Sequence, residues 1–125
     1  MYMIFFVLHN PDLLEEVLNA WEEAGVGGVT IFASTGLARI RAKGEWRDDI
    51  PLFPSLEDFQ EHLQNLNRTL VTIVENEAMV DKVVAATQNV TGDLNLPNTG
   101  ILSVLPVLRS YGLNRKPDVN GSENL

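Results

Sequence analysis

The sequence predicts one α+β domain in which two main helices cover one face of an antiparallel β-sheet. Three observations lead to this prediction. Four segments are rich in apolar and β-branched residues, as strands are. Two segments between them place apolar residues at helical spacing. A length of 125 residues allows one domain with a single modest core.

The first strand is expected at residues 2–8 of the opening MYMIFFVLH, where the only polar side-chain group is a tyrosine hydroxyl. A strand with one face in water normally alternates apolar and polar residues, because successive side chains point to opposite sides. This segment does not alternate, so both of its faces are expected to be buried.

The first helix is expected to begin directly after this strand. Asn10, Pro11 and Asp12 end the extended run and supply an N-cap and first-turn residues. Gly25 stands where a C-cap glycine belongs, and Gly27–Gly28 prolong the turn. The apolar face of this helix is predicted to consist of Leu13, Leu14, Val17, Leu18, Trp21 and Ala24.

The second strand and a long connection are expected next. Residues 29–33 are rich in β-branched side chains and predict the strand, and residues 34–36 predict a turn. Residues 37–41 are a candidate extension of the strand. Residues 44–54 contain two prolines and have loop character. Apolar residues at helical intervals predict a short extra helix near residues 56–66.

The second half of the chain is expected to supply the remaining strands and the second main helix. Residues 70–74 predict a strand, residues 91–100 a turn-rich loop, and residues 101–108 a final strand that is almost continuously apolar. Residues 77–87 predict an amphipathic helix, whose inward positions are Met79 or Val80, Val83, Val84 and Thr87.

This order of elements is that of a ferredoxin-like βαββαβ sandwich with an extra short helix in the connection after the second strand. The domain is expected to span residues 1–113. Residues 114–125 are polar, with Lys, Pro, Asn, Gly and Ser, and are expected to form a disordered tail.

The first and last strands are apolar on both sides, yet two helices can cover only one face of the sheet. An exposed apolar face of this size usually marks an association surface. Self-association into a closed ring is the simplest explanation. The alternative is that the short helix at residues 56–66 folds back over the open face.

Composition excludes several classes of function. The formal net charge of −8 argues against nonspecific nucleic-acid binding, although local donors can still bind an anionic nucleotide. The absence of cysteine excludes disulfides, thiolate metal sites and thiol nucleophiles. The apolar start is far shorter than the roughly 20 residues that span a bilayer, so no membrane insertion is expected. The default expectation is a cytoplasmic protein.

Several segments resemble the PII nitrogen-regulatory signal proteins. Residues 14–30, LEEVLNAWEEAGVGGVT, resemble the first helix and second strand of that family, with its Ala-Gly-Val-x-Gly passage and following Thr. Residues 34–39, STGLAR, are similar to the glycine–apolar–glycine–arginine base of the family's T-loop. Thr91–Gly92 and residues 100–107, GILSVLPV, resemble its B-loop and fourth strand. The resemblance covers most of residues 1–109.

The resemblance implies a ferredoxin-like fold, a homotrimer whose sheets line a central core, and effector sites between neighbouring subunits. It implies a small-molecule effector, above all ATP, ADP or AMP, and an unidentified protein target. The expected trimer agrees with the apolar residues on both faces of the first and last strands. That observation predicts self-association without use of the resemblance.

The sequence also departs from the family pattern. The region that matches the T-loop, residues 42–68, has no tyrosine, so uridylylation is not expected there. The B-loop counterpart TGDLNLPNTG is longer, and Gly100 stands where the family's phosphate-binding lysine belongs. The terminal basic loop is reduced to residues 108–112. The matched ligand-binding positions that remain are Thr30, Gly36, Leu37, Arg39, Thr91 and Gly92, together with Arg109.

These residues suit a phosphate-bearing ligand. Gly36 and Gly92 would offer backbone N–H groups, and Arg39 a planar guanidinium fork. Thr30 would hydrogen-bond an adenine edge. The structural alternative is that both glycines only serve turns and that the threonine only packs.

No constellation of catalytic residues is recognisable. His9 and His62 are isolated: neither has an Asp or Glu at i+3 or i+4 in a recognisable ligand pattern, and there is no cysteine to assist. Asp48–Asp49 are expected to be solvated loop residues. Trp21 is expected in the core, whereas Trp46 is the better candidate for a partner contact. We therefore expect a non-enzymatic protein without a metal site.

The first hypothesis is a trimeric PII-like regulator whose effector, on binding, orders the loop at residues 34–54 and so changes the surface offered to a target. The alternatives are a metal-linked trimer of the related CutA type, a scaffold with a decayed nucleotide site, and, least favoured, a small enzyme with its active site at the trimer interface.

Overall fold

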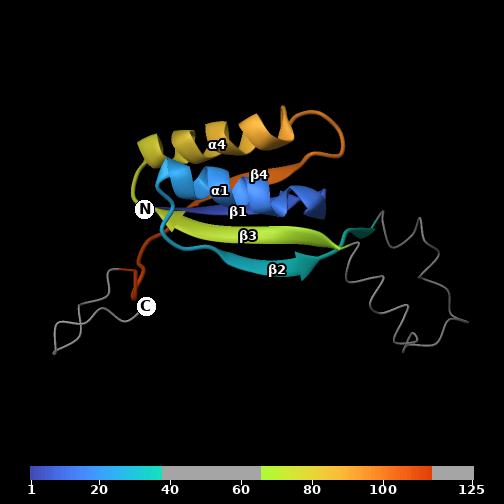
Figure 1. Cartoon of the computed structure of the whole chain (residues 1–125). Helices are drawn as coiled ribbons and strands as arrows, with labels where there is room; N and C mark the ends of the chain where they lie inside the picture. The colour runs from blue at the N-terminus through green and yellow to red at the C-terminus, as the bar shows by residue number, and fades with distance from the viewer. Residues whose placement is uncertain (38–65, 114–125) are drawn as a thin grey trace, which may run out of the picture.

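The computed structural model of the chain describes residues 1–37 and 66–113. Four strands form one antiparallel sheet, and two helices pack together on one face of it, which makes a two-layer α+β architecture (Figure 1). In chain order the elements are β1 (Tyr2–Leu8), the 3-10 helix η1 (Pro11–Leu13), α1 (Leu14–Ala24), β2 (Thr30–Ser34), β3 (Asn67–Val74), α4 (Glu77–Thr91) and β4 (Gly100–Pro106).

The strand order across the sheet is β2-β3-β1-β4, so β2 and β4 are the two edges. Each neighbouring pair is antiparallel, and β2 therefore runs in the same direction as β1 while β3 and β4 run in the opposite direction. One row of the register crosses the whole sheet and contains Thr30, Val71, Phe5 and Ser103.

The residues predicted to start and end the first helical segment, Asn10 and Gly25, lie at its two ends. The Asn10 side chain accepts a hydrogen bond from the Asp12 backbone N–H at 3.0 Å, as expected of a cap. Gly25 ends α1 in the left-handed region, with φ 106°. In α4 the Asn76 side chain caps the helix by accepting from the Met79 N–H at 2.9 Å. A side chain therefore caps α4 directly, whereas Asn10 caps the 3-10 helix η1 that leads into α1, and α1 itself has no side-chain cap at its start.

The core lies between the helices and the sheet. Trp21 is fully buried, as its helical spacing predicts, and its indole Nε1 donates to Thr87 Oγ1 at 2.8 Å. The Thr87 hydroxyl in turn donates to the Val83 carbonyl at 2.7 Å. This chain of hydrogen bonds satisfies polar groups that would otherwise be costly to bury. The core cluster comprises Ile4, Phe6, Leu8, Val17, Trp21, Leu70, Val74 and Val83.

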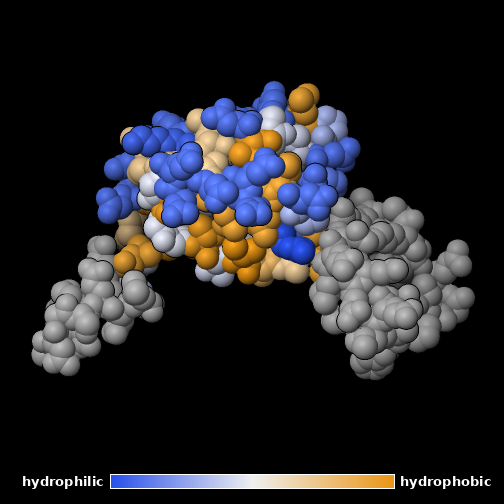
Figure 2. Space-filling view, in the orientation of Figure 1, coloured by the Kyte–Doolittle hydropathy of each residue, from blue (hydrophilic) through white to orange (hydrophobic). Residues whose placement is uncertain are grey.

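The opposite face of the sheet, here called the open face, has no helix of the described residues on it. Its residues are the alternate strand positions that point away from α1 and α4. Most of them are apolar: Met3, Phe5, Val7, Phe32, Val71, Ile73, Ile101 and Leu105. Figure 2 shows hydrophilic side chains over the helices and hydrophobic ones gathered along the sheet.

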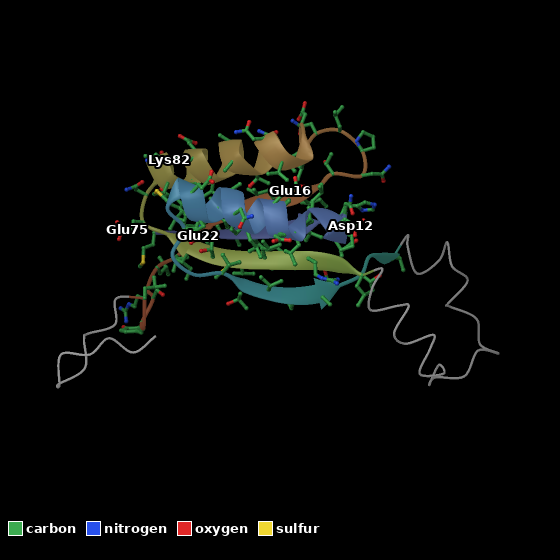
Figure 3. The ribbon with its side chains drawn as sticks, viewed as in Figure 1. Asp12, Glu16, Glu22, Glu75 and Lys82 are labelled. Carbon is green, nitrogen blue, oxygen red and sulfur yellow. The ribbon has the colours of Figure 1, made fainter. Side chains whose placement is uncertain are left out.

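Among residues 1–37 and 66–113, most charged side chains belong to the helical layer and its connections. Figure 3 shows Asp12, Glu16, Glu22 and Lys82 on the helix side of the molecule. The only charged residue within the four strands is Arg68. Arg68 pairs with Leu8 in the register, so it lies on the face of the sheet that the helices cover and not on the open face. The sheet thus presents an uncharged outer surface.

The predicted elements are confirmed with shifted ends. β1 and α1 lie where the sequence places them, and β2 is displaced by one residue. β3 begins at Asn67 rather than Leu70, and α4 continues four residues further, to Thr91. β4 ends at Pro106, earlier than predicted. The inward face of α4 is confirmed at Val83 and Thr87, both buried.

Some predictions lie outside the described residues. These are the loop at 44–54, the disordered tail at 114–125, and the short helix at 56–66 except for Leu66, which forms a bend before β3. The candidate strand extension at 37–41 is described only at Leu37, which is not in the strand. Among the described residues, no helix combines the length and apolarity required to cross a membrane.

Candidate functional site

Six of the seven predicted ligand-binding residues are described: Thr30, Gly36, Leu37, Thr91, Gly92 and Arg109. The seventh, Arg39, lies outside the described residues. Four of the six gather at one end of the sheet, where β1 and β2 end and β3 and β4 begin. The register defines this end, because Leu8 lies opposite Gly100 and Ser34 lies opposite Asn67.

Gly36 and Leu37 follow the end of β2 and are exposed. A Cβ on Gly36 would meet no heavy atom within 4 Å, and Gly36 is not among the glycines with positive φ. The described geometry therefore does not require glycine at this turn. What glycine provides here is open space beside the backbone, which a phosphate oxygen needs for close approach.

Thr91 and Gly92 form the end of α4. The Gly92 N–H donates to the Gln88 carbonyl at 2.8 Å, and its φ is 82°. The Thr91 hydroxyl lies within donating distance of the Thr87 carbonyl (3.2 Å) and the Gly92 carbonyl (2.9 Å). The Gly92 N–H is therefore already used by the helix, and this glycine serves the turn. The predicted role of its N–H as a phosphate donor is not favoured by this geometry.

Gly100 explains why the family's lysine is missing from this position. Its φ is 150°, and a Cβ built on it would collide with the Val7 carbonyl oxygen and the Phe6 ring. No side chain fits without moving β1. A phosphate-binding lysine is excluded here by packing, so any cation at this end must come from another residue.

The two halves of the candidate site belong to different layers of the domain. Gly36 follows the edge strand β2, whereas Thr91 and Gly92 end α4 in the helical layer and lead into the other edge strand, β4, through the loop before Gly100. Three strand spacings separate β2 from β4, which is about 14 Å at the usual spacing. Figure 1 shows the loop from α4 to β4 at the end of the sheet where the β2 arrow points.

Thr30 and Arg109 stand apart from these residues. Thr30 is exposed on the open face, in the row of Phe5 and Val71. Arg109 follows β4 and is exposed at the far end of the sheet. The length of β4, about 20 Å, lies between Gly100 at the candidate end of the sheet and the segment that contains Arg109. The chain therefore does not gather all of the predicted residues around one point.

A polar trio on the open face was missed by the sequence prediction. The Ser34 and Thr69 hydroxyl oxygens are hydrogen-bonded at 2.7 Å beside the end of β2. Asn67, in the same corner, is only 9% exposed, and its Oδ1 has no hydrogen-bond partner among the described residues. Such an acceptor is costly to leave unpaired and suits an N–H donor. The missed signal is the alternation of Asn67 and Thr69, which extends the strand pattern back from residue 71.

At the opposite end of the sheet, a tyrosine joins β1 to α4. The Tyr2 hydroxyl donates to Glu77 Oε1 at 3.2 Å. This hydrogen bond, followed by the nearby carboxylate charge and some burial, raises the pKa of Tyr2 above its usual 10.0. The pair ties the start of α4 to the sheet, and it lies at the end opposite to Gly36, Leu37, Thr91 and Gly92.

The described residues bring together no group of three His, Cys, Asp or Glu side chains that could hold a metal ion. No family model matches this chain, and no curated protein matches its sequence. Function must therefore be argued from the geometry.

Proposed function

We propose that this chain is the subunit of a homotrimeric, PII-like regulatory protein of ferredoxin-like fold. The protein would bind a small anionic effector of the adenine-nucleotide class between its subunits and signal to a partner protein. The observation that carries the proposal is the uncharged, largely apolar open face of the sheet.

The size of the open face supports self-association. Phe5 is 37% exposed and Phe32 is 45% exposed. Since an aromatic side chain offers roughly 150–250 Å², these two rings alone leave on the order of 160 Å² in water. The neighbouring aliphatic side chains enlarge the patch to roughly the few hundred Å² that mark interaction surfaces on soluble proteins.

The fold supports the family proposal. The chain order of strands and helices, the antiparallel pairing and the sheet order β2-β3-β1-β4 are those expected of a ferredoxin-like sandwich. This fold hosts many functions, so it supports the family without specifying the effector.

The divided candidate site supports binding between subunits. Gly36 follows the edge strand β2, and the turn at Thr91–Gly92 leads from α4 into the other edge strand, β4. The two edge strands are three strand spacings apart, about 14 Å, so a neighbouring copy could bring the second turn close to the first. Subunit association would provide this arrangement.

Two measurements on the full-length protein test the proposal. Native mass spectrometry at micromolar concentration is expected to give three chains of 13.9 kDa, about 42 kDa in total. Thermal-shift titration is expected to show stabilisation by ATP, ADP, AMP or a cyclic adenine nucleotide. A ligand at 100 times its Kd adds about 2.7 kcal/mol to the free energy of unfolding. GTP serves as the control for the base.

Two arginines offer a matched pair of variants. Arg39→Gln is expected to abolish the nucleotide-dependent shift, because its guanidinium is the predicted phosphate ligand. Arg41→Gln removes the same charge two residues away and is expected to leave the shift intact. A protein that remains a single chain at micromolar concentration, or that no adenine nucleotide stabilises at millimolar concentration, would contradict the proposal.

A further inference from the structure

Arg68 lies at the end of the sheet where the candidate ligand residues gather, and it is the only charged residue of the four strands. It is the second residue of β3, between Ala33 of β2 and Leu8 of β1 in the register. The other Lys and Arg side chains of the described residues are Lys82, within α4, and Arg109, beyond the far end of the sheet. Arg68 is therefore the basic side chain closest to the turn after β2 in the described part of the chain.

The Arg68 side chain turns back along its own strand. Its Nη1 donates to the Leu66 carbonyl at 2.7 Å and to the Asn67 carbonyl at 3.4 Å. Asn67 pairs with Ser34, the last residue of β2, so the Leu66 carbonyl lies past this pair, at the level where β2 continues towards Gly36. Neighbouring strands are about 4.8 Å apart, and Figure 1 shows the end of β2 beside the start of β3. The guanidinium is thus held next to the turn of Gly36.

One edge of this guanidinium donates to none of the described residues. An arginine carries five N–H donors, and here those of Nη1 serve the two carbonyls. The edge formed by Nε and Nη2 presents two parallel N–H groups, which match two oxygens of a phosphate. Arg68 is only partly buried, so a ligand can reach this edge. Because the carbonyls already hold the side chain, binding would cost little additional ordering.

The other candidate phosphate contacts are weaker. Packing excludes a lysine at Gly100, and the Gly92 N–H is used by α4. Gly36, in contrast, has open space beside its backbone. Phosphate-binding chemistry therefore gathers where β2 ends and β3 begins, within a single subunit.

We infer that Arg68 is a phosphate-binding residue of the candidate site, whose Nε and Nη2 edge holds two oxygens of an effector phosphate beside Gly36. The inference rests on the proposed function, and it adds a residue that is not among the positions matched by the resemblance. The competing explanation is that Arg68 only ties down the start of β3 through its two carbonyl contacts.

Calorimetric titration of the full-length protein with adenosine, AMP, ADP and ATP separates these roles. Arg68→Gln is expected to weaken at least one nucleotide about 10- to 100-fold, the worth of hydrogen bonds to a charged group, and to leave adenosine unchanged. A purely structural role would weaken adenosine and nucleotides alike. Lys82→Gln removes the same charge from an exposed position of α4 and is expected to change no affinity. Arg68→Lys keeps the charge without the planar fork and is expected to restore only part of the loss.

A folded Arg68→Gln variant with unchanged nucleotide affinities, or with an equal loss for adenosine, would overturn the inference. Equal binding of adenosine and all nucleotides by the wild type would do the same. If Arg68→Gln does not fold, the wild type provides a second readout, in which phenylglyoxal modification of each arginine is mapped by mass spectrometry. ATP is expected to slow the modification of Arg68 relative to adenosine, and equal rates would overturn the inference. A wild type that binds none of the four compounds would instead refute the proposed function.

Discussion

Ile101→Ser tests whether the open face is buried between copies of the chain. Ile101 lies on the open face of the edge strand β4, and 68% of it is exposed in the single chain. The substitution removes apolar surface that contributes little to the fold of one subunit. A strand position on an edge tolerates serine at a cost below about 1 kcal/mol.

The expected effect on assembly is much larger. Fully burying an isoleucine side chain is worth about 1.5–3 kcal/mol, and the exposed part of Ile101 accounts for about two thirds of that, or about 1–2 kcal/mol per subunit. Three copies give about 3–6 kcal/mol per trimer. At 1.4 kcal/mol for each factor of ten, the trimer association constant should fall roughly 10²- to 10⁴-fold.

Sedimentation velocity across a dilution series from micromolar to nanomolar concentration measures this change. Ala85→Ser, an exposed substitution on α4, is the matched control and should leave the dissociation midpoint unchanged. Circular dichroism shows whether the variant subunit still folds. If Ile101→Ser is folded and dissociates at the same concentration as the wild type, the open face around β4 is not an interface, and the reasoning from exposed apolar surface is wrong.

Three further predictions concern the subunit itself. Thr87→Val keeps the shape but removes the acceptor for the Trp21 indole N–H, so denaturant unfolding should show a loss of about 1–3 kcal/mol. Equal stability of Thr87→Val and wild type would contradict this. Gly100→Ala places a Cβ against the β1 backbone at φ 150°, so the free energy of unfolding should fall by more than about 1 kcal/mol, whereas a change within error would show that β1 can move aside. Because Glu77 raises the pKa of Tyr2 above 10.0, the stabilisation from this pair is complete below pH 10 and is lost as the pH rises through the raised value. Tyr2→Phe should lack this alkaline loss in unfolding experiments above pH 10, and an identical pH profile would rule out the linkage.

The main elements could be predicted because their signals are local. The helical spacing of α1 places Trp21 in the core, and Gly25 adopts the left-handed conformation expected of a helix end. The apolar run of β1 predicts that both of its faces are buried, and the single chain buries the face under the helices while Phe5 on the other face is 37% exposed. All of these depend only on the order of residues within one segment.

The element ends could not be predicted, because distant contacts decide them. Asn67 and Thr69 look polar in sequence, yet they extend β3 because β2 pairs with them and Ser34 bonds to Thr69. α4 continues past the predicted end, and its threonines at 87 and 91 return their hydroxyls to carbonyls of the preceding turn. These hydrogen bonds satisfy the threonine hydroxyls inside the helix, which local sequence preferences alone do not predict because threonine has a low helix propensity.

The candidate site shows the same division between local signals and long-range arrangement. The glycines at positions 36 and 92 are visible in the sequence, but the sequence alone does not reveal that one follows the edge strand β2 and that the other leads from α4 towards the opposite edge strand, β4. These two strands are about 14 Å apart at the usual strand spacing. The edge strands β2 and β4 carry no charge, whereas the charged residues labelled in Figure 3, including Asp12, Glu16 and Glu22, lie on the helix side. A surface with this division of charge is expected in a subunit whose sheet, and not its helices, contacts its neighbours. An assembly through the helices would have to bring these carboxylates together, and their repulsion would weaken it at low salt. An assembly through the uncharged sheet would not be weakened in this way. The salt dependence of trimer dissociation therefore distinguishes the two modes of association.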